Sequence, residues 1–226
     1  MKRNVLYSAF IVMTAFILFN TSLTAKAKNI NNIETNIDIN NPTILKEQAT
    51  IFYKNGNYLQ SLSYFLNVKD SDIDKDSLIL MANCYDSLGD MKKAYESLVK
   101  AQELDPQNSS IYYNLGILHY KSGNIDFAID NFYKAAKYKR HFKEAYYNLG
   151  NSYFLKKDYK NALKNYLKAY KLDPNNENTV YNLTLIYEKL NDLQKAQIYT
   201  AKYKSLIYQQ GDNGNLSTGV LNNIKY

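Results

Sequence analysis

The pentapeptide "YYNLG" occupies Tyr112 to Gly116 and occurs again at Tyr146 to Gly150. A third copy, "VYNLT", runs from Val180 to Thr184, and each copy begins 34 residues after the one before. Internal repetition with a period of roughly 20 to 50 residues is typical of proteins that are built from similar, stacked units. The spacing of this short stretch therefore predicts a repeat architecture.

The unit that contains the second copy predicts two helices. It spans residues 143–176 and has the sequence "KEAYYNLGNSYFLKKDYKNALKNYLKAYKLDPNN". Small and aromatic residues recur at steps of four and three in each half, namely Tyr146, Gly150 and Tyr153, then Ala162, Tyr166 and Ala169. Such steps place side chains on one face of an α-helix. Because "LKKDYKN" interrupts the pattern and Pro174 cannot continue a helix, we expect helix, turn, helix and stop.

The same pattern continues in register through most of the chain. Alanine recurs every 34 residues, at Ala94, Ala128, Ala162 and Ala196. The expected units span residues 42–74, 75–108, 109–142, 143–176 and 177–208, and the first is one residue short. A single pair of helices cannot bury both of its faces, so the units are expected to stack on one another.

These residues resemble the tetratricopeptide repeat family. Its pattern is aromatic-x-x-Leu-Gly-x-x-Tyr, then Ala-x-x-x-aromatic, then proline. The fourth unit fills that pattern in order with Tyr146, Leu149, Gly150, Tyr153, Ala162, Tyr166 and Pro174. The resemblance covers about residues 42–208. It implies an all-α fold, an α-solenoid of about five helix-turn-helix units in a right-handed superhelix, with the first helices along a concave wall.

Small residues and departures from the pattern add detail. Gly116 and Gly150 predict close helix contacts, because two helices approach closely only where one facing residue is small. Arg140 stands where the pattern has proline, so the third unit ends less sharply. The last unit has Thr184 in place of glycine and Thr200 in place of the aromatic residue, which fits a capping role at the end of an array.

The resemblance also implies a partner-binding groove. A face beside the packing stripe of each first helix carries tyrosines, which bury area at low entropy cost and keep one polar group. An asparagine column beside it could bond a ligand backbone or, alternatively, the neighbouring helix. The predicted groove residues are Tyr113, Asn114, Tyr120, Tyr147, Asn148, Asn151, Phe154, Tyr181 and Asn182. The carboxylate-clamp subtype is not expected: Lys46 could match its first lysine, but Thr50 and Leu80 replace its asparagines.

The first 27 residues predict a signal peptide or a membrane anchor. Lys2 and Arg3 precede the apolar run "VLYSAFIVMTAFILF" at residues 5–19, and "AKA" at residues 25–27 is a pattern that signal peptidases accept. The run would span roughly 22 Å as a helix, less than a bilayer core of roughly 30 Å, which favours cleavage after Ala27. The alternative is an uncleaved anchor to about Leu23. Either way, we expect an extracytoplasmic protein in the periplasm, the cell envelope or the medium.

Two polar segments flank the array. Residues 28–41 predict a linker, and residues 209–226, rich in Gly, Asn and Ser, predict a flexible tail. Removing residues 1–27 would take away three basic residues and lower the formal charge from +7 to +4. The remaining excess is dispersed, which argues against a nucleic-acid partner.

The residues that usually carry chemistry are scarce. Cys84 is the single cysteine, so neither an intrachain disulfide nor a cysteine metal cluster can form. The sequence contains no Gly-rich phosphate loop, no HExxH and no GxSxG motif. We therefore expect no catalytic residues, no metal site and no cofactor. Three functions remain: a non-enzymatic scaffold that binds a protein or peptide, a binder of cell-wall material or glycan, and a helical-repeat RNA binder.

Overall fold

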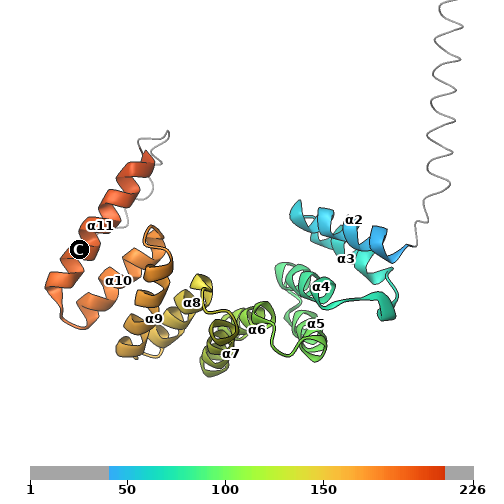
Figure 1. Cartoon of the computed structure of the whole chain (residues 1–226), viewed down its shortest axis with the longest axis horizontal. Helices are drawn as coiled ribbons and strands as arrows, with labels where there is room; N and C mark the ends of the chain where they lie inside the picture. The colour runs from blue at the N-terminus through green and yellow to red at the C-terminus, as the bar shows by residue number, and fades with distance from the viewer. Residues whose placement is uncertain (1–40, 212–226) are drawn as a thin grey trace, which may run out of the picture.

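The computed structural model describes residues 41–211, with side chains to Tyr208, and Figure 1 shows a curved row of helices in chain order. The described residues form ten α-helices, one short 3-10 turn and no strand. The expected signal or anchor (1–27), most of the linker (28–41) and most of the tail (209–226) lie outside the described residues. The elements are α2 (Pro42–Lys54), α3 (Tyr58–Leu66), η1 (Asp70–Asp72), α4 (Lys75–Ser87), α5 (Met91–Leu104), α6 (Ser109–Lys121), α7 (Ile125–Tyr138), α8 (Lys143–Leu155), α9 (Tyr159–Leu172), α10 (Glu177–Lys189) and α11 (Leu193–Gly211).

The helices pair as the 34-residue period predicts. The first helix of each pair begins at the residue where the expected unit begins, namely Pro42, Lys75, Ser109, Lys143 and Glu177. The all-α repeat fold is therefore confirmed. In the short first unit, α3 has 9 residues, whereas α5, α7 and α9 have 14 each. At the other end, α11 continues beyond Tyr208, where the array was expected to end.

Every first helix ends in the same left-handed turn. In the fourth unit, Asp158 N–H donates to the Tyr153 carbonyl and Lys157 N–H donates to the Phe154 carbonyl, both at 2.9 Å. These two bonds form a Schellman motif, which satisfies the last carbonyls of the helix. The residue with positive φ in the five turns is Gly56, Gly89, Gly123, Lys157 and Asn191. Glycine suits this position because it has no Cβ.

The residue after each turn begins the second helix. Asp90, Asp158 and Asp192 each accept a hydrogen bond from a backbone N–H three residues later, at 3.0 to 3.2 Å. Such N-caps satisfy a free donor at the helix start. Hydrogen bonds from Asn161 hold the pKa of Asp158 below its usual value, and those from Lys195 do the same for Asp192.

Close packing in the middle of the array depends on two glycines. A Cβ atom on Gly116 would lie 2.6 Å from the ring of Phe132, and one on Gly150 would lie 2.5 Å from the ring of Tyr166. Both rings belong to the second helix of the same unit and are almost fully buried. The expected close contact is therefore present, between the backbone of one helix and an aromatic ring of its partner.

The buried residues form three clusters along the row. The first centres on Phe65, Leu98 and Ile111, the second on Phe132 and Ala145, and the third on Tyr166, Leu183 and Ile186. Each cluster joins neighbouring helix pairs, as expected for a stack in which each unit covers the next. Among the described helices, none is both long and apolar enough to cross a bilayer.

Candidate partner-binding groove

The groove tyrosines occupy one position in three successive first helices. Tyr113 lies on α6, Tyr147 on α8 and Tyr181 on α10. The first two are half-buried, and Tyr181 is 45% exposed. Each ring packs on an aromatic residue of the following helix, with centroid separations of 5.8 Å to Phe132, 6.1 Å to Tyr166 and 5.4 Å to Tyr203, respectively. The tyrosines are thus held in place by their own units.

Asparagines of the next unit bond to two of these tyrosines. Asn148 Nδ2 donates to the Tyr113 hydroxyl at 3.1 Å, and Asn182 Nδ2 donates to the Tyr147 hydroxyl at 3.3 Å. Asn114 makes no side-chain hydrogen bond within residues 41–208. Two of the three asparagines in the predicted column therefore bond from helix to helix.

Asn151 connects the groove to the core. Its Oδ1 accepts from the Tyr166 hydroxyl at 2.8 Å and from Asn182 Nδ2 at 3.1 Å. Burial raises the pKa of Tyr166, so this hydroxyl stays protonated and acts as a donor. A residue predicted for the groove thereby fixes the contact between α8, α9 and α10.

A pocket of about 190 Å³ opens between the first turns of α8 and α10. Three of the predicted groove residues line it, namely Tyr113, Tyr147 and Asn148. Further lining comes from residues outside the predicted set, among them Lys143 and Glu144 on α8, Asp173 after α9, and Asn178 on α10. The structure therefore brings part of the predicted set into one cavity and adds charged and amide groups to it.

The charges at this pocket are unevenly compensated. Lys143 Nζ lies 2.7 Å from Asp173 Oδ2, and this hydrogen bond holds the pKa of the Asp173 carboxyl below its usual value. Glu144 is exposed and has no ion pair within the described side chains. The pocket thus offers two aromatic rings, amide groups and one unpaired carboxylate. Such a lining fits a peptide segment that brings N–H donors or a basic side chain.

Two predicted residues lie away from this pocket. Tyr120 and Phe154 occupy the last turns of α6 and α8, whereas the pocket lies at the first turns of α8 and α10. The Phe154 ring packs on Tyr159 at 5.7 Å. Burial, together with the neighbouring Tyr147, raises the pKa of Tyr120. The predicted face therefore runs along the full length of the first helices, and only one end of it is hollowed.

The pair of Lys143 and Asp173 was not predicted, although the sequence contains a signal for it. Lys75 and Asp105 form the equivalent contact two units earlier, at 3.5 Å. In both pairs the lysine begins a first helix, and the aspartate follows the second helix 30 residues later. A repeated pair of opposite charges at one spacing would have pointed to this contact.

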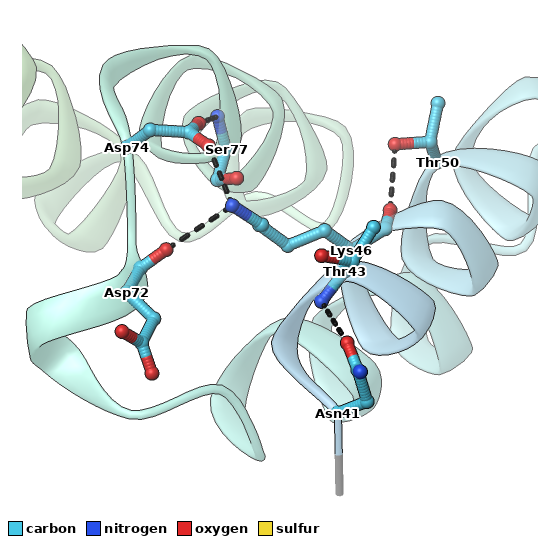
Figure 2. Close-up of polar contacts among 7 residues, drawn as sticks. All are labelled: Asn41, Thr43, Lys46, Thr50, Asp72, Asp74 and Ser77. Carbon is cyan, nitrogen blue, oxygen red and sulfur yellow. Dashed lines mark hydrogen bonds and ion pairs between the residues drawn. The ribbon is translucent and has the colours of Figure 1, made fainter. Parts of the chain in front are cut away.

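Figure 2 shows why the carboxylate clamp is not formed at the N-terminal end. Lys46 Nζ donates to Asp74 Oδ2 at 2.8 Å and to the Asp72 carbonyl at 3.2 Å. Asp74 is the N-cap of α4 and also accepts from Ser77 N–H at 2.8 Å. Burial opposes ionisation of Asp74, but the bonds from Lys46 and Ser77 outweigh it and lower its pKa. Thr50 donates to the Lys46 carbonyl, so this site joins two units internally.

The described residues contain no cluster of three or more His, Cys, Asp or Glu side chains that could hold a metal ion. Cys84 is fully buried, and its Sγ donates to Ser61 Oγ at 3.5 Å. Burial raises the pKa of this thiol, which disfavours the reactive thiolate. The geometry therefore supports binding by shape and hydrogen bonds.

Comparison with known families identifies the repeats. Residues 109–142 and residues 144–176 each match the tetratricopeptide repeat, and residues 82–123 match a TPR repeat. These matches fall on the units that the 34-residue period defines. The chain therefore contains tetratricopeptide repeats, as the sequence predicts.

Two relatives share parts of the sequence. The Photosystem I assembly protein Ycf3 of Prochlorococcus marinus (strain MIT 9211) is 33% identical over 94 residues, which cover 36% of this chain and 54% of that protein. The peptidyl-prolyl cis-trans isomerase FKBP4 of Bos taurus is 27% identical over 125 residues, covering 48% of this chain and 27% of that protein. The chain thus spans about half of one relative and about a quarter of the other.

Solved structures of MamA share the fold. A crystal structure of MamA superposes with a TM-score of 0.67 at 22% identity, and covers 73% of this chain and 96% of that one. MamA from Desulfovibrio magneticus RS-1 gives a TM-score of 0.68 at 20% identity, with 75% and 96% covered. At this level of identity the likeness confirms the α-solenoid architecture alone.

Proposed function

With tetratricopeptide repeats as the premise, we propose that this chain is a non-enzymatic scaffold that binds a peptide or helix of a partner protein. Tetratricopeptide repeats generally bind protein partners, and one relative, Ycf3, is named an assembly protein. The partner would lie across Tyr113, Tyr147 and Tyr181. The observation that carries this proposal is the pocket between α8 and α10, which Tyr113 and Tyr147 line.

The chemistry of the pocket suits a peptide. Tyrosine rings bury apolar area and keep a hydroxyl for hydrogen bonds, which is why they are frequent in binding hot spots. Asn148 and Asn178 add amide groups, and Glu144 adds a carboxylate at the same pocket. A segment with one apolar side chain and a neighbouring lysine or arginine would satisfy these groups together.

Photo-crosslinking at the groove tests this proposal. A benzophenone amino acid at Tyr181, on the groove face, should capture the partner, whose identity mass spectrometry would give. The same amino acid at Tyr133 on α7, which is 61% exposed, is the matched control. The affinity of the purified partner should then fall roughly ten-fold or more in Tyr147→Ala/Tyr181→Ala, since a tyrosine hot spot contributes about 2 kcal/mol. Equal binding by this variant and by Tyr133→Ala would refute the groove.

We also propose that the array acts outside the cytoplasm, in the cell envelope or the medium. This location rests on the sequence of residues 1–27 alone. If the segment is a cleaved signal peptide, the protein purified from its native host should begin at Lys28. Intact-mass measurement and cell fractionation would check this, and recovery of the full-length chain from the cytoplasm would contradict it.

A further inference from the structure

A second cavity, of about 430 Å³, lies between α7, α8 and α9. Its volume is within the range of roughly 300–1,000 Å³ that is usual for ligand pockets. We call it the basic pocket and define it by its four cations and three tyrosines, namely Lys137, Arg140, Lys164, Lys168, Tyr133, Tyr146 and Tyr153. No acidic residue lines it.

The basic pocket is separate from the groove. On α8, Tyr146, Leu149 and Tyr153 line the basic pocket, whereas Tyr147 and Asn148 line the groove pocket. At about 100° per residue, the two sets point to sides of the helix that are roughly half a turn apart. A ligand in one site would therefore leave the other open.

The cations of the basic pocket are available to a ligand. Lys137, Arg140, Lys164 and Lys168 are all exposed, and none has an ion pair within the described part of the chain. Lys168 Nζ lies 4.9 Å from the centroid of the Tyr146 ring. Asp130, one turn before Tyr133 on α7, is engaged by Lys134 at 2.8 Å. The positive charge is thus uncompensated inside the cavity.

The equivalent cavity two units earlier has a different charge. It has a volume of about 510 Å³ and uses the same helix positions, since Leu78, Met81 and Tyr85 correspond to Tyr146, Leu149 and Tyr153. Its lining, however, mixes Lys93 and Lys100 with Asp70, Glu96 and Glu103. Glu96 holds the position of Lys164. The cavity thus follows from the repeat, whereas the purely positive lining is particular to α7–α9.

A departure from the repeat pattern contributes one of these cations. Arg140 stands where the second and fourth units have Pro106 and Pro174. The exchange removes a residue that ends helices and places a guanidinium at the cavity. Arginine binds carboxylates through two parallel N–H bonds. A residue that breaks a local rule is often explained by function, and here it increases the positive charge.

We propose that the basic pocket binds a short acidic segment of a partner protein. Clustered cations pair with carboxylates, and the tyrosines and Asn161 can bond the backbone of the segment. A long polyanion fits less well, because it would extend along the row toward the cavity that contains Asp70, Glu96 and Glu103. The proposal deepens the scaffold function by adding a second binding site with its own ligand chemistry.

A labelled acidic peptide tests this site. The probe is a fluorescein-labelled hepta-glutamate peptide, and its binding to the purified full-length chain is followed by fluorescence anisotropy at low salt. In Arg140→Gln/Lys164→Gln/Lys168→Gln, the dissociation constant should rise roughly ten-fold or more, since three ion pairs are lost. The matched control is Lys54→Gln/Lys69→Gln/Lys204→Gln, which removes the same charge from exposed lysines elsewhere and should bind like the wild type. Equal weakening in both variants would overturn the site.

Two further arms separate this inference from the groove and from nucleic acid. Tyr147→Ala/Tyr181→Ala should bind the acidic peptide normally, so the groove could fail its own test while the basic pocket passes. Weakened peptide binding in that variant would place the peptide in the groove and overturn the proposal. Poly-uridylate that displaces the peptide at lower concentration, through the same three cations, would assign the pocket to RNA instead. Lys164→Arg/Lys168→Arg, which keeps the charge, should retain affinity.

Discussion

At the scale of single residues, Gly150 is a position where one methyl group would disturb two helices. The Cβ of an alanine there would lie 2.5 Å from the ring of Tyr166, which is 2% exposed and bonded to Asn151. We expect Gly150→Ala to lower the free energy of unfolding by about 1–3 kcal/mol, because overpacking forces the ring or the helix to move. Thermal and urea unfolding would measure the change.

A second substitution provides the control for this prediction. In a Tyr166→Leu background the added methyl group meets a smaller side chain, so the cost of Gly150→Ala should shrink in a double-mutant cycle. An unchanged melting temperature in the single variant would show that the close contact does not determine the packing of this unit.

Single residues also show where sequence and structure agree and where they part. The glycine and alanine columns predict the close contacts, because small size has one main packing use. The uses of Asn114, Asn148 and Asn182 could not be predicted, because an asparagine bonds equally well to a ligand or to a neighbouring helix. Two of them bond to tyrosines of the preceding unit, a contact that depends on how the units stack.

At the scale of elements, the turn after α8 stores strain that the other units avoid. Lys157 has φ of 60° at the position where the first three units have glycine. A side chain in the left-handed region costs roughly 1–2 kcal/mol, partly offset by the greater freedom of glycine in the unfolded chain. We therefore expect Lys157→Gly to stabilise the protein by roughly 0.5–1 kcal/mol in urea unfolding. Lys160→Gly, inside α9, should destabilise it by about 1 kcal/mol. Stabilisation by both would contradict the explanation.

The aspartate caps of the second helices predict a loss of stability in acid. Hydrogen bonds lower the pKa of Asp158 and Asp192 in the folded state. The stabilisation from such groups is complete above the unfolded pKa of about 3.9 and disappears as the pH falls through the lower folded pKa. The melting temperature should therefore fall below about pH 4. Asp158→Asn, which still caps the helix, should show a smaller fall, and an identical pH profile would argue against the cap.

Helix boundaries were predictable, whereas cavities were not. The first helices begin where the 34-residue units begin, because caps and turns are local and recur with the period. The groove pocket and the basic pocket each combine residues from three or more elements. Glu144 and Asn178 come together only because α10 stacks on α8, and the sequence does not give that offset.

At the scale of the whole molecule, the three buried clusters predict that stability is local. Each cluster joins neighbouring units only, so a disturbance should fade along the row. We expect Gly150→Ala to speed amide hydrogen exchange in α8–α11 while leaving α2–α4 nearly unchanged. Mass spectrometry of peptic fragments would show this gradient. A uniform increase over residues 42–208 would mean that the array unfolds as one cooperative unit.

The sealed thiol has a practical consequence. Cys84 is the single cysteine of the chain and is fully buried, and its raised pKa disfavours the form that alkylating reagents attack. A new cysteine on the surface would therefore be modified against a silent background, with no native residue replaced beforehand. Leu59 and Tyr208, which are 70% and 67% exposed near opposite ends of the row, are suitable positions for a pair of spin labels. The distance between them would give the span of the arc in solution and its change when a ligand closes or opens it.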